Sequence, residues 1–114
     1  MHVVRKTQWL PLCKKRDLVE GSGVCALVGN AQVALFYLPQ EEGGIFALNN
    51  HDPIAGANVL SRGIVGDVGG RLVVASPIYK QHFDLTNGEC LEQNEVQVTT
   101  YKVRLEGDDV LIAN

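Results

Sequence analysis

Short apolar runs separated by polar, glycine-rich breaks cover most of this chain. The first two runs span 24–28 and 32–38, and the connection Gly29-Asn30-Ala31 between them is typical of a β-hairpin. Pro39 ends the second run. The segment 40–44, rich in glutamate and glycine, predicts a solvated turn before another strand. The pattern therefore favours strands from the beginning.

The middle of the chain predicts two loops. Residues 49–63 contain Pro53 and Gly56 and keep no fixed apolar period, which indicates a long ordered loop. Two strands around a glycine-rich turn follow over 63–75, and a second loop over 76–81 precedes a short strand. Loops of this length in a compact domain are usually functional or the remains of a functional site.

The last quarter has the clearest alternation of the whole sequence. One strand is predicted over 96–105, and a turn at 107–109 leads into a final hairpin strand. One helical turn is predicted over 15–20, with Gly21 ending it. We expect a single all-β domain over residues 1–114, built as an antiparallel sandwich or a small barrel.

Composition narrows the classes of function. The chain has 114 residues, 46% hydrophobic and 20% charged, which is ordinary for a soluble domain. A net charge of −3, with Lys14-Lys15-Arg16 as the densest basic run, argues against nucleic-acid binding. No apolar run approaches the roughly 18 residues of a membrane span, and the first ten residues lack a secretory signal. Three widely spaced cysteines indicate reduced thiols, so we expect a cytoplasmic protein.

Several segments resemble motifs of catalytic or binding sites, but the sequence around each one does not fit such a site. Residues 21–26 match a dinucleotide fingerprint, but a hairpin follows where a helix is required. The three histidines and three cysteines lack the close pairs of metal knuckles. Ser61 and Ser76 lie outside a nucleophile elbow, and His82 and Asp84 share one face of a strand. We therefore predict no catalytic, cofactor-binding or metal-binding residues.

Four blocks between residues 47 and 88 resemble the frame of a Rieske iron–sulfur domain. They are Ala47–Ile54, Leu60–Gly63, Ser76–Tyr79 and Phe83–Gly88. In that family, Cys-x-His and Cys-x-x-His motifs supply two thiolates and two imidazoles to the cluster.

The ligand slots of this frame hold other residues. They hold a carboxylate, an alkyl group, a hydroxyl and a phenol, at Asp52, Ile54, Ser76 and Tyr79. The resemblance implies a Rieske-like fold in which the ligand loops persist without a cluster.

From Leu12 onward the chain resembles the small subunit of bacterial NAD(P)H-dependent nitrite reductase. The more specific blocks are Leu60-Ser61-Arg62-Gly63 and Ser76-Pro77-x-x-Lys80-Gln81-x-Phe83. The resemblance implies a non-catalytic subunit without a cofactor, acting in nitrate assimilation. The resemblance further implies a large partner subunit that carries FAD, a [4Fe–4S] cluster and sirohaem, and that reduces nitrite to ammonium. A degenerate Rieske module of another redox complex is the alternative, whereas the ligand substitutions argue against an electron-carrying ferredoxin.

The two loops also predict a candidate interface. Arg62, Lys80 and Gln81 flank the old ligand slots, while Asp52 and Ser76 are good local acceptors for unpaired N–H groups. These five residues either hold the loops together or contact a partner. Our hypothesis is that residues 52–62 and 76–81 dock the large subunit.

Overall fold

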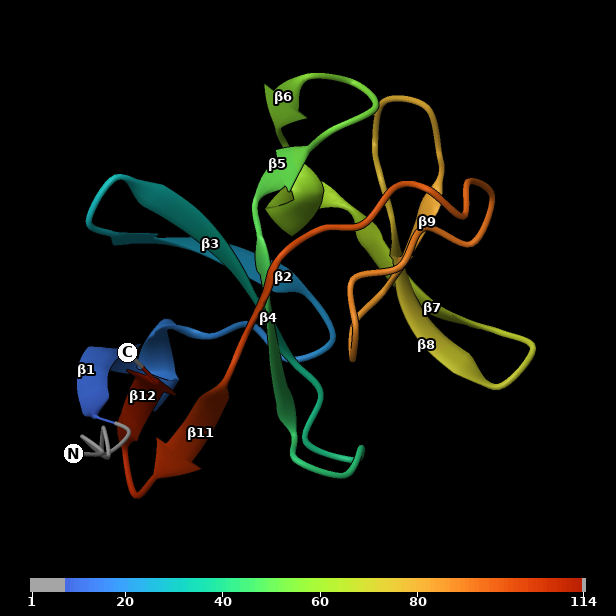
Figure 1. Ribbon diagram of the computed structural model, residues 1–114. Coiled ribbons are helices and arrows are strands. Elements are labelled where there is room, and N and C mark those ends of the chain that lie inside the picture. Colours follow the sequence, from blue (N-terminus) through green and yellow to red (C-terminus); the bar gives the residue numbers. More distant parts are fainter. Residues whose placement is uncertain (1–7, 114) are drawn as a thin grey trace, which may run out of the picture.

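The computed structural model describes residues 8–113, and strands make up nearly all of its regular structure (Figure 1). All strand pairs are antiparallel. The largest sheet has the order β10-β4-β3-β2, with bounds Thr100–Tyr101, Ile45–Asn49, Ala31–Tyr37 and Gly23–Val28. A second has the order β1-β12-β11, with bounds Trp9–Lys14, Asp109–Ala113 and Val103–Glu106. The all-β prediction is confirmed.

Two smaller sheets and two 3₁₀ turns complete the fold. The sheet β7-β8-β9 has the bounds Ile64–Val68, Arg71–Ala75 and His82–Asp84. The hairpin β5-β6 has the bounds His51–Asp52 and Ala57–Asn58. The turns are η1, Lys15–Asp17, which lies where one helical turn is predicted, and η2, Leu60–Arg62. The sheets stay separate and do not close into a barrel, so the sandwich alternative holds.

Strand β3 lies between the two hydrophobic cores of the molecule. Side chains alternate along a strand, so Val33 and Leu35 face one side while Ala34 and Phe36 face the other. All four are fully buried. The first pair packs with residues of β4 and β12, and the second packs with residues of β4, β8 and β9. Burial on both faces explains why 32–38 reads as a continuous apolar run.

The predicted single strand over 96–105 is wrong. The chain pairs with β4 through β10, then leaves that sheet and pairs with β12 through β11. Lys102 lies at the change of sheet, where its carbonyl accepts a hydrogen bond from the Ala113 N–H. Earlier in the segment, the Val98 N–H donates to the Gly88 carbonyl outside any named strand. A chain that crosses between sheets stays extended, so the alternation survives although the pairing changes.

The long loop predicted over 49–63 contains more regular structure than expected, since β5, β6 and η2 all lie within it. Residues 52–56, at the end of the β5-β6 hairpin, and residues 76–81, between β8 and β9, are called the tip loops below. Figure 1 shows them at the same end of the molecule, away from β1 and β12. There Trp9 pairs with Ala113, so both ends of the described chain lie opposite the tip loops.

Candidate functional site

The two tip loops are joined at their bases by the side chains of Asp52 and Ser76. Both residues are fully buried, and Ser76 Oγ donates a hydrogen bond of 2.5 Å to Asp52 Oδ2. These are two of the four slots that the Rieske frame assigns to cluster ligands. A carboxylate and a hydroxyl therefore connect the loops where the frame places two thiolates.

The second oxygen of Asp52 shapes its own loop. Asp52 Oδ1 accepts hydrogen bonds from the N–H groups of Ile54 at 2.9 Å and Ala55 at 3.1 Å. The Gly56 N–H closes the turn by donating to the Asp52 carbonyl at 2.8 Å. An aspartate that caps the backbone two and three residues later is a standard way to fix a tight turn. Both oxygens of the buried carboxylate are thus hydrogen-bonded, Oδ1 within the first tip loop and Oδ2 to the second.

Backbone contacts fix the second tip loop. Ser76 donates its N–H to the Gln81 carbonyl at 2.9 Å and accepts from the Lys80 N–H at 3.1 Å. Lys80 has a φ of +66°, a left-handed conformation that costs a non-glycine residue about 1–2 kcal/mol. Its ammonium also donates to the Pro77 carbonyl at 3.0 Å. The loop is held in one shape despite this local strain.

The remaining two slots do not offer cluster ligands. Ile54 is half-buried and packs against the core cluster that contains Phe83. Tyr79 is 62% exposed. A Rieske cluster needs thiolates on one iron and neutral imidazoles on the other, so this donor set does not fit the group. Within residues 8–113, no three His, Cys, Asp or Glu side chains form a group that could hold a metal ion.

The five residues of the predicted interface occupy different environments. Asp52 and Ser76 lie in the interior, so their side chains hold the loops and do not reach a partner. Arg62 and Lys80 are exposed. Gln81 is half-buried, and its Oε1 is buried without a hydrogen-bond partner in the described structure. The sequence left open whether these residues hold the loops together or contact a partner. The geometry indicates that Asp52 and Ser76 hold the loops, whereas Arg62 and Lys80 lie at the surface.

Sequence reasoning missed Asn50, which ties the 3₁₀ turn η2 to the main sheet. Asn50 is buried, and its Oδ1 accepts the Ser61 N–H at 2.7 Å. Its Nδ2 donates to Gln32 Oε1 at 3.1 Å. The side chain thereby links η2 to strand β3. An amide directly after an apolar strand was the available signal, although the sequence did not show its partners.

His82 and Asp84, the other polar candidates from the sequence, bind partners outside the tip loops. His82 Nδ1 lies 2.7 Å from Glu92 Oε2, and the His82 N–H donates to Glu92 Oε1. Asp84 accepts from Thr86 and from Arg71 Nε at 2.9 Å. Both side chains are therefore committed to partners other than Ser76. The segment after Gly21 runs into strand β2, which excludes the helix that a dinucleotide site requires.

Two of these carboxyl groups have perturbed pKa values. Burial acts to raise the pKa of Asp84, but hydrogen bonds from Thr86 and the Arg71 guanidinium outweigh it and hold the pKa below its usual value. Burial likewise opposes a lowered pKa at Glu92, where hydrogen bonds from His82 prevail. Both groups contribute to structure at neutral pH in the charged form.

Comparison with known proteins identifies the scaffold. Residues 8–113 match the family of Rieske-like [2Fe-2S] domains. The small subunit of NADH nitrite reductase from Salmonella typhimurium is 44% identical over 100 residues, covering 88% of this chain and 92% of that protein. The NMR structure of the E. coli protein NirD superposes with a TM-score of 0.84 at 38% identity. That match covers 96% of this chain and 98% of the other.

A third relative contains the same domain within a longer chain. The large subunit of nitrite reductase [NAD(P)H] from Klebsiella oxytoca is 36% identical over 106 residues. The match covers 93% of this chain but 11% of that large subunit. Among the described residues, no helix is long and apolar enough to cross a membrane.

Proposed function

The chain belongs to the Rieske-like [2Fe-2S] domain family and, within it, to the small subunits of NADH-dependent nitrite reductase; from this we propose that it serves the large subunit without a redox centre of its own. The observation that carries this proposal is the buried hydrogen bond between Asp52 and Ser76. It places non-ligating groups in two slots where the family's cluster needs thiolates. The domain therefore keeps the two loops of the Rieske frame but lacks the side chains that bind the cluster.

We propose that electrons travel from NADH or NADPH to nitrite entirely within the large subunit. In this scheme FAD, a [4Fe–4S] cluster and sirohaem are all bound by that subunit, which reduces nitrite to ammonium in nitrate assimilation in the cytoplasm. The Klebsiella relative supports a lasting association, since its large subunit includes a domain like this one in the same polypeptide. Covalent linkage keeps such a domain at a high effective concentration beside the rest of its large subunit.

We further propose that residues 1–114 form a single Rieske-like domain that acts as one docking unit. Its candidate contacts with the large subunit are Lys80 and Gln81 in the second tip loop and Arg62 in η2. Asp52 and Ser76 support these contacts from inside by fixing both loops. Loops on a rigid scaffold are suited to such recognition because little order has to be gained on binding.

The test is reconstitution of nitrite reduction from separately purified subunits. We expect the large subunit with its cofactors to form ammonium faster when the chain is added, with saturation near one chain per large subunit. The isolated chain should be colourless and should co-elute with a coloured large subunit. A chain that neither co-elutes with the large subunit nor changes its rate would contradict the proposal and reopen the module of another redox complex.

A further inference from the structure

Exposed apolar side chains lie on and beside the second tip loop. Ile78 is 44% exposed and Tyr79 is 62% exposed, both at the turn of this loop. Ile64 is 75% exposed and pairs in register with Ala75, the residue directly before the loop. Single exposed apolar residues are normal, but a group at one end of a small domain marks an interaction surface. None of these three residues is among the five candidate contacts named from the sequence.

The loop that presents Ile78 and Tyr79 is held before any partner arrives. Ser76 anchors its start to Asp52, and the Lys80 and Gln81 backbone groups close it. The positive φ of Lys80 persists because these contacts determine the backbone around it. Docking a loop that is already ordered avoids much of the entropy cost of binding.

Two exposed basic residues lie close in sequence to this group on a chain with a net charge of −3, while the acidic Glu92 is paired with His82, directly after the loop. Arg62 lies two residues before Ile64, and Lys80 directly follows Tyr79; both are exposed. The ion pairs within residues 8–113 engage other basic groups, namely Lys14, Arg71, His82 and Arg104. Two cations beside an apolar group fit a partner surface that is apolar in its centre and acidic around it.

We propose that Ile64, Ile78 and Tyr79 are the apolar centre of the contact with the large subunit. Arg62 and Lys80 then face carboxylates at its edge. This inference rests on the proposed function and names the contact within it. The large subunit is the occupant favoured by the comparisons, because this chain resembles nitrite reductase small subunits and a similar domain lies within the Klebsiella large subunit. The ends of the described chain lie away from the tip loops, which leaves the tip accessible (Figure 1). A domain of this kind joined to a longer chain through either end would still have its tip free to dock.

The test measures the affinity of the cofactor-loaded large subunit for four forms of the full chain. They are the wild type, Ile78→Ser, Tyr79→Ser and the control Leu27→Ser. Leu27 suits the control because it is apolar and 70% exposed on β2, outside the tip loops. We expect each tip variant to bind at least tenfold more weakly, since aromatic and aliphatic anchors at an interface centre dominate binding. Leu27→Ser should bind within twofold of the wild type.

A second comparison tests the charged edge. Arg62→Glu and Lys80→Glu should slow association severalfold at low salt and less at high salt, because ions screen such steering. Lys102→Glu, on an exposed residue between β10 and β11, is the matched control and should leave the association rate within twofold.

The outcomes separate this inference from the function on which it rests. If the wild type binds and the tip variants match it, the contact lies elsewhere and this inference is overturned, while the proposed function stands. Loss of binding by Leu27→Ser to the same degree as by Tyr79→Ser would overturn it too. If the wild type itself fails to bind the large subunit, the proposed function falls. Circular dichroism of each variant should match the wild type, because all substituted side chains are exposed.

Discussion

Ser76 Oγ donates to Asp52 Oδ2 in the interior between the tip loops, and one substitution tests its importance. Ser76→Ala removes the donor and leaves a buried carboxylate oxygen without it. We expect the free energy of unfolding to fall by about 1–3 kcal/mol, the usual cost of an unsatisfied buried group. Urea titration measures it.

Ser61→Ala is the matched control, since the Ser61 hydroxyl makes no hydrogen bond within the described structure and its contact with Asn50 uses the backbone. Its effect should stay below about 0.5 kcal/mol. Equal losses in the two variants would show that the tip loops do not depend on the buried pair.

Gln81 offers the opposite case, a buried polar atom without a partner. Its Oε1 finds no hydrogen-bond donor among the described residues. Replacing a polar side chain whose acceptor is unsatisfied by an apolar one of similar shape can be neutral or stabilising. We therefore expect Gln81→Met to leave the free energy of unfolding unchanged within about 0.5 kcal/mol, or to raise it. A larger loss in urea titration would show that Gln81 Oε1 has a partner in solution.

Asp84 and Glu92 predict the acid response of the fold. Their pKa values lie below the ordinary values of 3.8 and 4.5, so the folded chain binds fewer protons than the unfolded chain in this range. Stability from these groups is complete above their unfolded pKa values and is lost as the pH falls through the lower folded values. We expect the urea midpoint to hold from about pH 7 to pH 5 and to fall below about pH 4.

The variant Asp84→Asn separates this contribution from that of the other carboxyl groups. An amide at this position cannot titrate, so the variant should start from a lower stability and lose less of it between about pH 5 and pH 3. An identical slope in both proteins would show that the pKa of Asp84 is not depressed in solution.

At the scale of elements, the turn after β9 depends on one glycine. Gly88 has a φ of +79°, and a Cβ at this position would collide with the backbone carbonyl of Val98. The Val98 N–H also donates to the Gly88 carbonyl, so the two segments cannot simply move apart. We expect Gly88→Ala to cost at least about 2 kcal/mol, since it combines a left-handed backbone with a close approach.

Gly66→Ala is the control for this prediction. Gly66 lies within β7 without a positive φ, and a Cβ added there would meet no other atom within 4 Å. Thermal unfolding should show this variant close to the wild type. If both alanine variants unfold at the same temperature, residues 88 and 98 lie farther apart in solution than in the structure.

Local patterns predicted most elements but not their pairing. The β2-β3 hairpin, the strand at β4 and the hairpin β11-β12 follow from apolar runs and turn residues close in sequence. The change of sheet at Lys102 could not be predicted, because an extended chain keeps the same alternation whichever neighbour it pairs with. The continuous apolar run at β3 is the local mark of burial on both faces, but the residues that form the two core clusters around it are known only from the tertiary structure.

At the scale of the whole molecule, the scaffold should still accept the cluster that its side chains no longer bind. The four substitutions Asp52→Cys, Ile54→His, Ser76→Cys and Tyr79→His restore the ligand set of the family. Asp52 and Ser76 already touch, so thiolates there would lie on one side of a shared site. We expect the quadruple variant, reconstituted with iron and sulfide, to be brown and to hold two irons per chain.

A triple variant that keeps Ser76 is the control and should remain colourless. Iron content and visible absorption measure both proteins. A colourless quadruple variant would show that the loops have moved too far from the geometry of the family, in addition to losing their ligands.

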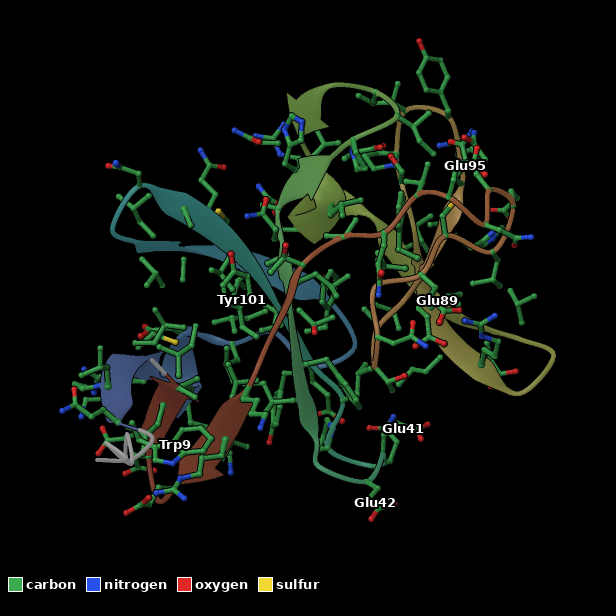
Figure 2. The ribbon with its side chains drawn as sticks, in the orientation of Figure 1. Trp9, Glu41, Glu42, Glu89, Glu95 and Tyr101 are labelled. Atoms are coloured by element: carbon green, nitrogen blue, oxygen red, sulfur yellow. The ribbon has the colours of Figure 1, made fainter. Side chains whose placement is uncertain are left out.

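The sequence alone determined that this is an all-β chain with a Rieske frame and that its ligand slots hold groups unable to bind the cluster, because these facts depend on residue types and short-range spacing. Tertiary structure decided how the slots are used. Asp52 and Ser76 are 24 residues apart, and their burial and hydrogen bond follow from folding two loops onto each other. The exposure of Ile78 and Tyr79 was also undetermined, because an apolar residue in a loop turns inward or outward according to distant neighbours. Tyr101, labelled in Figure 2, belongs to β10, and only the folded chain packs it against the core cluster that contains Val33 and Leu35.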